Sequence, residues 1–343
     1  MNLKEGYTLG QDGLCMLVHE SPEVYLIKVP YPNITTNSTN CYAICDGGEC
    51  LVVDTGAPSA EGRSVMEGAL KLIGANSART SFFLTHLHKD HAGMVDWLVP
   101  RERPLYVGAR DYALNLERMS AAYAHKAYER FVAEGIDAEH AQRYTAYKTS
   151  DEDAFSADRD LRLVKPGDEI RVGDCVLQIV DTAGHTPGHL SLYEPESGVF
   201  FGGDHVLFVV SPVLELSQEL TGVMDTYLAS LDRTVHMDIS SYYHSHGPLK
   251  PGWRERALHL ADHHKRRLDE VAMLVSAKPG MTGDQIIKNI RWSAKIDPWD
   301  EVPAPLQWCI VSEGLVVIDC LVERGVIERC TDNSGIRTYF AAS

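Results

Sequence analysis

The sequence predicts an α/β fold in which a layered α/β sandwich is followed by a small winged-helix-like domain. The first supporting observation is that short β-rich runs, separated by Gly, Pro and Asn turns, occur in two groups with a helical stretch between them. The second is a turn-rich linker at Gly247–Gly252, after which three helical patterns and a hairpin pattern follow. We therefore expect a large domain over residues 1–250 and a small domain over residues 257–343.

In the large domain, the first group of strands is expected at Val24–Val29, Cys41–Cys45, Leu51–Val53 and Ser81–Leu84. A helix fits Glu61–Ile73 and would end at Gly74. Residues 111–150 lack a strand pattern and are rich in Ala, Glu, Tyr and Arg, which predicts a helical insertion that could act as a lid or simply pack. The second group of strands is expected at Leu161–Val164, Glu169–Val180, Leu190–Glu194 and Val199–Phe201.

The small domain should contain three helices and a hairpin. An apolar stripe predicts the first helix over Ala257–Ala277, and a capping box of Thr282 with Gln285 starts the second. The third helix would run from Pro305 to Gly325. Strands at 326–330 and 336–340 would form the hairpin. Because the third helix is largely apolar, we expect it to be a packing surface for the large domain or for a second subunit.

Composition restricts the possible partners. The formal net charge is −16 at pH 7, which disfavours nucleic-acid binding because an acidic surface repels phosphates. The eight cysteines show no Cys-x-x-Cys spacing, so we expect free thiols. No charged and apolar leader and no long apolar run is evident, so we expect a cytoplasmic protein without a membrane partner. A small-molecule substrate and a possible homodimer remain as expected partners.

The segment that carries chemistry is Thr85-His86-Leu87-His88-Lys89-Asp90-His91, which directly follows an apolar strand. His86 and His88 are two residues apart and can point the same way, so they can hold one metal ion. Asp90 and His91 project to a neighbouring position and can hold a second ion. Imidazole with carboxylate is a ligand set that suits zinc or iron.

Later motifs supply further ligands of the same kinds. They are Thr182-Ala183-Gly184-His185-Thr186-Pro187-Gly188-His189, Gly202-Gly203-Asp204-His205 and His244-Ser245-His246-Gly247-Pro248. Together with Val53-Asp54-Thr55-Gly56, these motifs resemble the metallo-β-lactamase-fold hydrolases in identity, order and spacing over roughly residues 20–250. The resemblance implies a four-layer αββα sandwich. The C-terminal extension is similar to that of the LACTB2-like branch of this family.

The resemblance also implies the roles of the residues. His86, His88 and His185 would bind one metal ion, and Asp90, His91 and His246 the other, with Asp204 between them. Two divalent ions are expected, zinc first, with iron or manganese as alternatives. His246 is preferred to His244 because of its His-Gly-Pro context. Asp54 would orient the ligands without binding a metal ion itself.

The implied activity is hydrolysis of a small ester, thioester, lactone or related acyl compound by a hydroxide held between the metals. Asp90 would orient this nucleophile. His264, on the apolar stripe of the first C-terminal helix, is a further candidate catalytic residue, although a core histidine explains it as well. His189 and His205 are expected to have structural roles.

Three other functions stay open. The first is an endoribonuclease or phosphodiesterase of the LACTB2-like type, which the C-terminal extension suggests and the acidic charge disfavours. The second is an iron-dependent redox member of the fold, which would not need all of the ligands present in this chain. The third is a binding protein that has lost turnover, which the intact ligand set disfavours.

Overall fold

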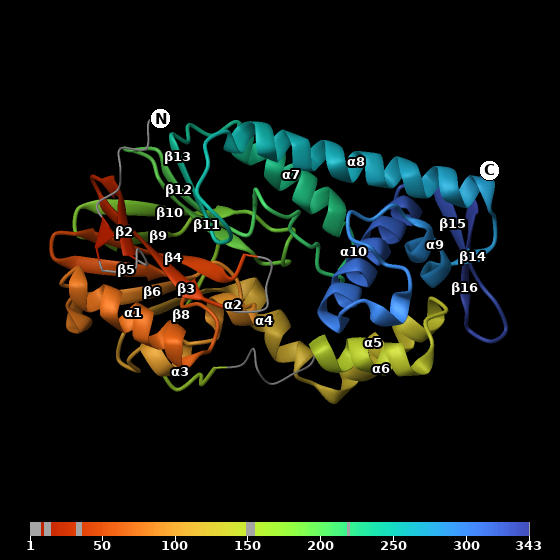
Figure 1. Ribbon diagram of the computed structural model, residues 1–343, viewed down its shortest axis with the longest axis horizontal. Coiled ribbons are helices and arrows are strands. Elements are labelled where there is room, and N and C mark those ends of the chain that lie inside the picture. The colour runs from red at the N-terminus through yellow and green to blue at the C-terminus, as the bar shows by residue number, and fades with distance from the viewer. Residues whose placement is uncertain (1–7, 10–14, 32–35, 149–154, 218–219, 343) are drawn as a thin grey trace. The chain divides into compact units, whose positions relative to one another are not determined.

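The computed structural model describes residues 8–9, 15–31, 36–148, 155–217 and 220–342 (Figure 1). The chain divides into two compact units. The first unit comprises Met1–Asn115, Glu152–Pro212 and Asp232–Ala257. The second comprises Leu116–Asp151, Val213–Leu231 and Leu258–Ser343. The expected insertion, residues 111–150, extends beyond the described residues at positions 149 and 150.

The first unit contains an eight-stranded sheet in which the strands follow their order in the sequence. The strands are β1 (Thr8–Leu9), β2 (Cys15–Glu20), β3 (Glu23–Pro30), β4 (Ser38–Asp46), β5 (Glu49–Val53), β6 (Thr80–Leu84), β7 (Leu105–Gly108) and β8 (Leu161–Val164). Neighbours from β1 to β5 are antiparallel, and those from β5 to β8 are parallel. Because β5 and β6 are parallel, their carboxyl ends open at the same edge of the sheet.

A second sheet in this unit has five strands in the order β13-β12-β11-β10-β9. They are β9 (Glu169–Val172), β10 (Cys175–Asp181), β11 (Leu190–Glu194), β12 (Val199–Gly203) and β13 (Ser241–His244). Only the β12–β13 pair is parallel among these neighbours. The expected single strand over 169–180 was wrong, because Gly173, with φ of 59°, turns the chain and separates β9 from β10.

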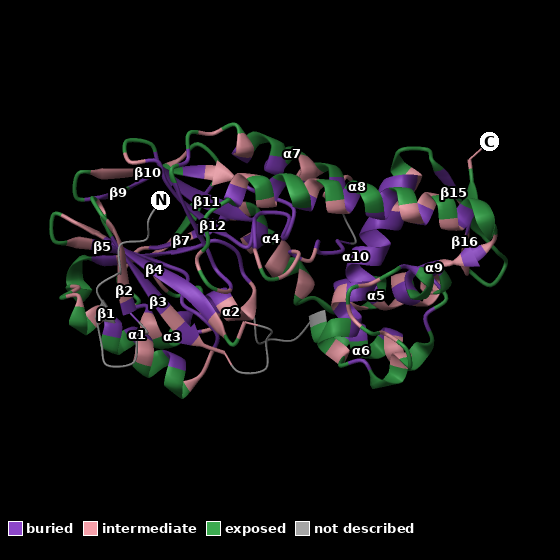
Figure 2. Ribbon diagram, turned by 45° about the horizontal axis from the view of Figure 1, so that its top comes forward, coloured by how far each residue is buried: buried purple, intermediate pink, exposed green. Residues whose placement is uncertain are grey.

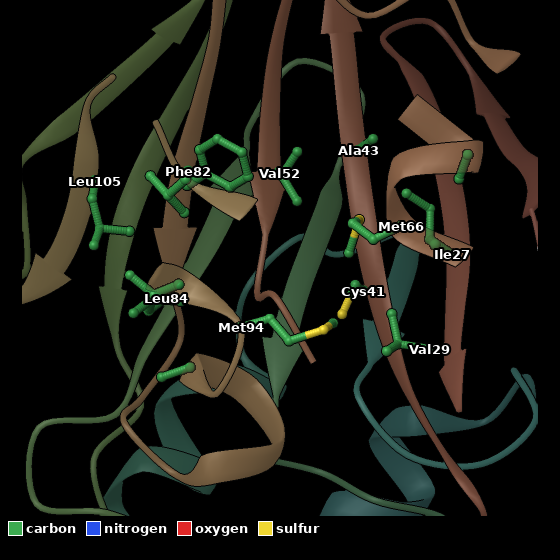
Figure 3. Packing of buried hydrophobic residues seen from close by; sticks show 14 of the residues in the cluster. Ile27, Val29, Cys41, Ala43, Val52, Met66, Phe82, Leu84, Met94 and Leu105 are labelled. Atoms are coloured by element: carbon green, nitrogen blue, oxygen red, sulfur yellow. The ribbon is translucent and has the colours of Figure 1, made fainter. Parts of the chain in front are cut away.

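The two sheets pack face to face through one hydrophobic core. Ile44, Leu51 and Phe83 of the first sheet lie in the same buried cluster as Leu192 and Phe201 of the second. On the other face of the first sheet, Met66 of α1 (Ala60–Leu72) packs against residues such as Cys41, Val52 and Phe82 (Figure 3). On the other face of the second sheet, Tyr242 stacks between Phe200 and Trp253. This arrangement is the layered α/β sandwich that the sequence predicts.

The remaining helices near the sheets are short or extend across the boundary between the units. α2 (Lys89–Ala92) and α3 (Val95–Leu98) follow β6 within the first unit. α4 (Ala109–Arg118), α7 (Val223–Val235) and α8 (Trp253–Ala277) each contribute residues to both units. Sequence patterns did not indicate α7, and α8 begins four residues earlier than the expected Ala257.

The second unit is mainly helical. It contains α5 (Ala121–Ala133), α6 (Ala138–Lys148), α9 (Gly283–Asn289) and α10 (Ala304–Glu323), together with a three-stranded sheet of β14 (Met281–Thr282), β16 (Arg337–Ala341) and β15 (Ile327–Thr331). Thr282 and Gln285 form the expected capping box at the start of α9. The three C-terminal helices and the hairpin therefore occur in the predicted order.

Helix α10 is the core helix of the second unit. It is long and apolar enough to cross a membrane by length and composition alone, but 72% of its most apolar window is buried in the fold (Figure 2). Its buried residues occur around the whole helix and include Trp308, Leu315 and Ile318. A helix that is apolar on all sides is expected in the centre of a folded unit.

Candidate metal centre

Three histidine side chains converge at the end of β6 and in the loop after β10. The Nδ1 atom of His88 lies 3.0 Å from Nε2 of His86 and 3.0 Å from Nε2 of His185. His86 and His185 are both almost completely buried. Three ring nitrogens directed at one point form a potential metal-binding group. At the usual Zn–N distance of roughly 2.0–2.1 Å, ligands around one ion lie about 3.3 Å apart, close to this spacing.

A second group forms beside the first. Nε2 of His246 lies 3.2 Å from Nε2 of His91 and 3.3 Å from Oδ2 of Asp90. The carboxylate of Asp204 lies between the two groups: its Oδ2 is 3.5 Å from His185 Nε2, and its Oδ1 is 3.4 Å from His246 Nε2. The structure thus brings together all the candidate metal ligands named from the sequence: His86, His88, Asp90, His91, His185, Asp204 and His246.

The charges of these side chains depend strongly on one another. Burial opposes ionisation of Asp204, but His246 and His91 outweigh burial and hold the pKa of Asp204 well below its usual value. Burial likewise lowers the pKa of His246, but Asp204 and Asp90 raise it far more. His86 differs, because burial and four neighbouring histidines depress its pKa, which favours the neutral ring. His86 and Asp204 are thus biased toward neutral imidazole and ionised carboxylate, the forms that ligate a cation, whereas His246 would have to lose its proton to bind one.

Asp54 fixes the orientation of His91. Oδ2 of Asp54 lies 2.8 Å from Nδ1 of His91, and Oδ1 accepts a hydrogen bond of 2.8 Å from the Thr85 backbone N–H. An Nδ1–H donated to Asp54 leaves the Nε2 lone pair of His91 facing His246 and Asp204. Thr85 Oγ1 also lies 3.1 Å from Nδ1 of His86. One buried carboxylate thus organises both groups of ligands.

The loop that carries His185 is held by Asp111, which the sequence did not reveal, and by His189. Asp111 of α4 accepts 2.5 Å hydrogen bonds from the Thr186 hydroxyl and from the Gly188 backbone N–H. His189 is buried, and its Nε2 accepts a 3.1 Å hydrogen bond from the Asp204 backbone N–H. Its other ring nitrogen lies 2.8 Å from the Thr182 hydroxyl. His189 thus connects the His185 loop to Asp204 and has the structural role expected of it.

The loop that carries His246 is held by β4. The side-chain amide of Asn40 donates to the carbonyl oxygens of His244 (3.1 Å) and Gly247 (2.8 Å). The Tyr42 hydroxyl donates to the same His244 carbonyl at 2.6 Å. The His244 ring is directed away from the ligands and packs 5.1 Å from Phe208, while His246 faces them. Asn40 is a second residue that sequence reasoning missed, because no spacing signal links it to the His-Gly-Pro motif.

The structure places His264 in the second unit. Its ring is fully buried and makes an edge contact with Tyr227, with the ring centroids 5.4 Å apart. Burial lowers the pKa of His264 to about 3, with His263 and Arg267 adding to the effect. With His263 and Glu313 it forms a separate group of potential ligand atoms. A catalytic role for His264 stays a prediction.

The residues of the first unit fit a binuclear metal site. Oδ1 of Asp204 is buried and accepts no hydrogen bond from any described residue, although His91 and His246 face it at 3.6 and 3.4 Å. A buried carboxylate oxygen without a donor is costly unless a cation completes its environment. His88 presents a related case, because its Nδ1 lies 3.0 Å from the Nε2 atoms of both His86 and His185, and a cation could be bound by all three nitrogens.

Comparison with known proteins agrees with this geometry. The family model described as the metallo-beta-lactamase superfamily matches residues 34–246, the range that includes every ligand above. The chain is similar to a beta-lactamase domain protein from Burkholderia ambifaria, at 23% identity and a TM-score of 0.75 over 95% of each chain.

Two further relatives are similar in sequence. A beta-lactamase-like protein 2 homolog of Caenorhabditis elegans is 23% identical over 284 residues, which cover 80% of this chain and 79% of that protein. A hydroxyacylglutathione hydrolase of Erythrobacter litoralis (strain HTCC2594) is 42% identical over 45 residues, which cover 13% of this chain and 18% of that protein.

Proposed function

The chain belongs to the metallo-beta-lactamase superfamily and is a metal-dependent hydrolase, and we propose that it is a binuclear enzyme that cleaves a small acyl compound. The substrate would be an ester, a thioester, a lactone or a related compound. The family match confirms the resemblance drawn from the sequence motifs. Zinc is the proposed metal, with iron or manganese as alternatives that the same ligand types accept.

One observation carries the proposal of two metal ions. The two groups of ligands meet at Asp204, whose Oδ2 faces His185 of the first group while its Oδ1 faces His246 of the second. Each group is by itself a set of potential ligand atoms, so a single ion would use one group and leave the other without a metal. The geometry therefore favours two ions, which the two groups of ligands would hold with Asp204 between them.

The protein contributes orientation and proton handling to the reaction. When bound, the metal ions supply a Lewis acid and make a water molecule a nucleophile near neutral pH. Asp90 is 23% exposed in its side chain, so one face of its carboxylate can meet a water or a substrate. Burial raises its pKa, but His91 and His246 outweigh burial and lower it, so Asp90 stays ionised and can accept a hydrogen bond from a water or a substrate. Asp54 and Asp111 hold His91 and the His185 loop in place.

An acyl substrate is preferred on two grounds. The net charge of −16 disfavours a polyanionic phosphodiester such as RNA. The local likeness to a hydroxyacylglutathione hydrolase supports hydrolysis of an acyl compound. We further propose that the C-terminal region is a winged-helix-like domain used for packing or dimerisation, and that the enzyme acts in the cytoplasm.

The test combines metal analysis with a substrate panel. His88→Ala should lose metal and hydrolysis of acyl thioesters, esters or lactones, because it removes the nitrogen on which His86 and His185 converge. His236→Ala is the matched control, since the His236 side chain is 75% exposed and is not among the candidate ligands. Full turnover by a metal-free His88→Ala protein would overturn the proposal.

The same panel separates the alternatives. Cleavage of single-stranded RNA that falls steeply with added salt, without acyl hydrolysis, would instead support a nuclease. Iron in protein purified without added metal, with oxygen consumption in place of hydrolysis, would support a redox enzyme.

A further inference from the structure

The hairpin that joins β4 and β5 carries two cysteines that face each other. Cys45 and Cys50 are direct partners in the antiparallel register, and their sulfur atoms are 2.9 Å apart. The connecting turn consists of Gly47 and Gly48, with φ angles of 56° and 75°. Two successive residues with positive φ are typical of a type I′ turn, which fixes the register of a two-residue hairpin. The backbone register of the hairpin therefore places the two thiols opposite each other.

The position of the pair in the ladder suits a covalent link. Asp46 and Glu49 close the hairpin, and the closing pair of a two-residue hairpin exchanges hydrogen bonds. Cys45 and Cys50 are the next pair, so they occupy the non-hydrogen-bonded kind of site, in which Cα atoms lie about 4.5 Å apart. Disulfides require a Cα separation of roughly 4.4–6.8 Å. The two cysteines therefore need only a small adjustment to form a bond.

We propose that Cys45 and Cys50 form an oxidisable dithiol, which a small neutral hydroperoxide converts reversibly into a cross-strand disulfide. A cavity of about 360 Å³ lies beside the pair and is lined by both residues. Cys45 is half-buried and Cys50 is buried. A reagent the size of hydrogen peroxide can thus reach Cys45 from the cavity, whereas Cys50 is less accessible to it.

The chemistry assigns different roles to the two sulfurs. The hydrogen bond with Cys50 lowers the pKa of Cys45, and the same contact raises the pKa of Cys50. The Cys45 thiolate attacks the peroxide oxygen, which gives a sulfenic acid and one water or alcohol. The Cys50 thiol then attacks the Cys45 sulfur, forms the S–S bond and releases a second water. Two thiols are oxidised and one peroxide bond is reduced, and a dithiol reductant reverses the change.

Charge around the cavity favours a neutral oxidant. The carboxylates that line it are Glu20, Glu23, Asp46 and Glu49. A cation near the cavity is Arg79, which is half-exposed and lies 3.3 Å from Glu49. A cavity with more carboxylates than cations repels anions such as glutathione disulfide. Hydrogen peroxide, which is uncharged, meets no such barrier.

The sequence allows a direct test of the link. The folded, full-length protein is treated with hydrogen peroxide, its free thiols are alkylated, and it is digested with a protease that cleaves after glutamate. Cleavage after Glu23, Glu49 and Glu61 places Cys45 and Cys50 on separate peptides, 24–49 and 50–61. We expect these peptides to be joined until a reductant is added, with two of the eight thiols lost to alkylation. Glutathione disulfide should give the link more slowly than peroxide at equal concentration.

Two variants identify the partner on peptide 24–49, which also contains Cys41. Cys41→Ser should retain the joined peptides, and Cys45→Ser should lose them. Metal content equal to the wild type shows that each variant is folded, and it keeps this test independent of the proposed hydrolase activity. Joined peptides in Cys45→Ser, or all eight thiols still alkylated in peroxide-treated wild type, would overturn the proposal.

Discussion

Replacing Asp54 by Asn tests how strongly one buried carboxylate controls the metal centre. Asp54 has φ of 61°, a left-handed conformation that Asn tolerates, so the backbone should be retained. The Asp54 carboxylate is 1% exposed and uses one oxygen for His91 Nδ1 and the other for Thr85 N–H, both at 2.8 Å. An amide has only one acceptor oxygen. Either His91 or Thr85 must therefore lose its acceptor in a buried position.

The cost follows from that loss. A buried donor without an acceptor costs about 1–3 kcal/mol. If His91 is the residue that loses its acceptor, we expect metal affinity to fall roughly 10–100-fold, as is usual when a residue that hydrogen-bonds to a metal ligand is replaced. Competition with a chelator measures the affinity, and thermal unfolding measures the part of the cost that falls on stability. Asp158→Asn is the matched control, because that side chain is 93% exposed. Wild-type affinity and wild-type stability together in Asp54→Asn would refute this account of the site.

Two further predictions concern Asp111 and Glu313. Asp111→Asn should lower the rate of hydrolysis roughly tenfold and weaken metal binding, because the His185 loop loses a charged hydrogen-bond acceptor. Steady-state kinetics and a metal titration would measure the two effects, and an unchanged rate with unchanged metal affinity would contradict the prediction. Burial raises the pKa of Glu313 from 4.5 to about 7, against the opposing effect of Arg267. The neutral Glu313 side chain therefore stabilises the fold fully below about pH 4.5, and this contribution is lost as the pH rises through about 7. Glu313→Gln should therefore gain on the order of 3 kcal/mol relative to wild type between pH 5 and pH 8 in denaturant titrations, since a tenfold change in an ionisation constant corresponds to about 1.4 kcal/mol; a difference independent of pH would contradict this.

The candidate metal ligands could be picked out from the sequence because each lies in a short motif at the end of a strand. His86, His88 and His91 are close in sequence, and the Gly-rich contexts of His185 and Asp204 made them conspicuous. The residues that hold these ligands were not predictable in the same way. Asn40 and Asp111 act through hydrogen bonds across 204 and 75 residues of chain, and such contacts leave no local pattern.

The fold was predictable where hydrophobic period and turn residues agree. Helix α1 and the capped helix α9 begin within one residue of their expected positions. The prediction failed where a single turn had to be placed, as between β9 and β10 at Gly173. It also missed β7, a short strand of four residues whose partners β6 and β8 are distant in sequence. The hydrophobic pattern of a short segment does not indicate which distant segment it will pair with.

The ligands of the metal centre come from both sheets of the sandwich: His86 follows β6 of the first, while His185 and Asp204 follow β10 and β12 of the second. An ion held by these residues would link the two layers and would be released when the layers part. Ligands that bind only the folded state add their binding free energy to its stability. The lifetime of this chain in a cell should therefore follow the metal supply, because proteases degrade the opened form that metal binding suppresses.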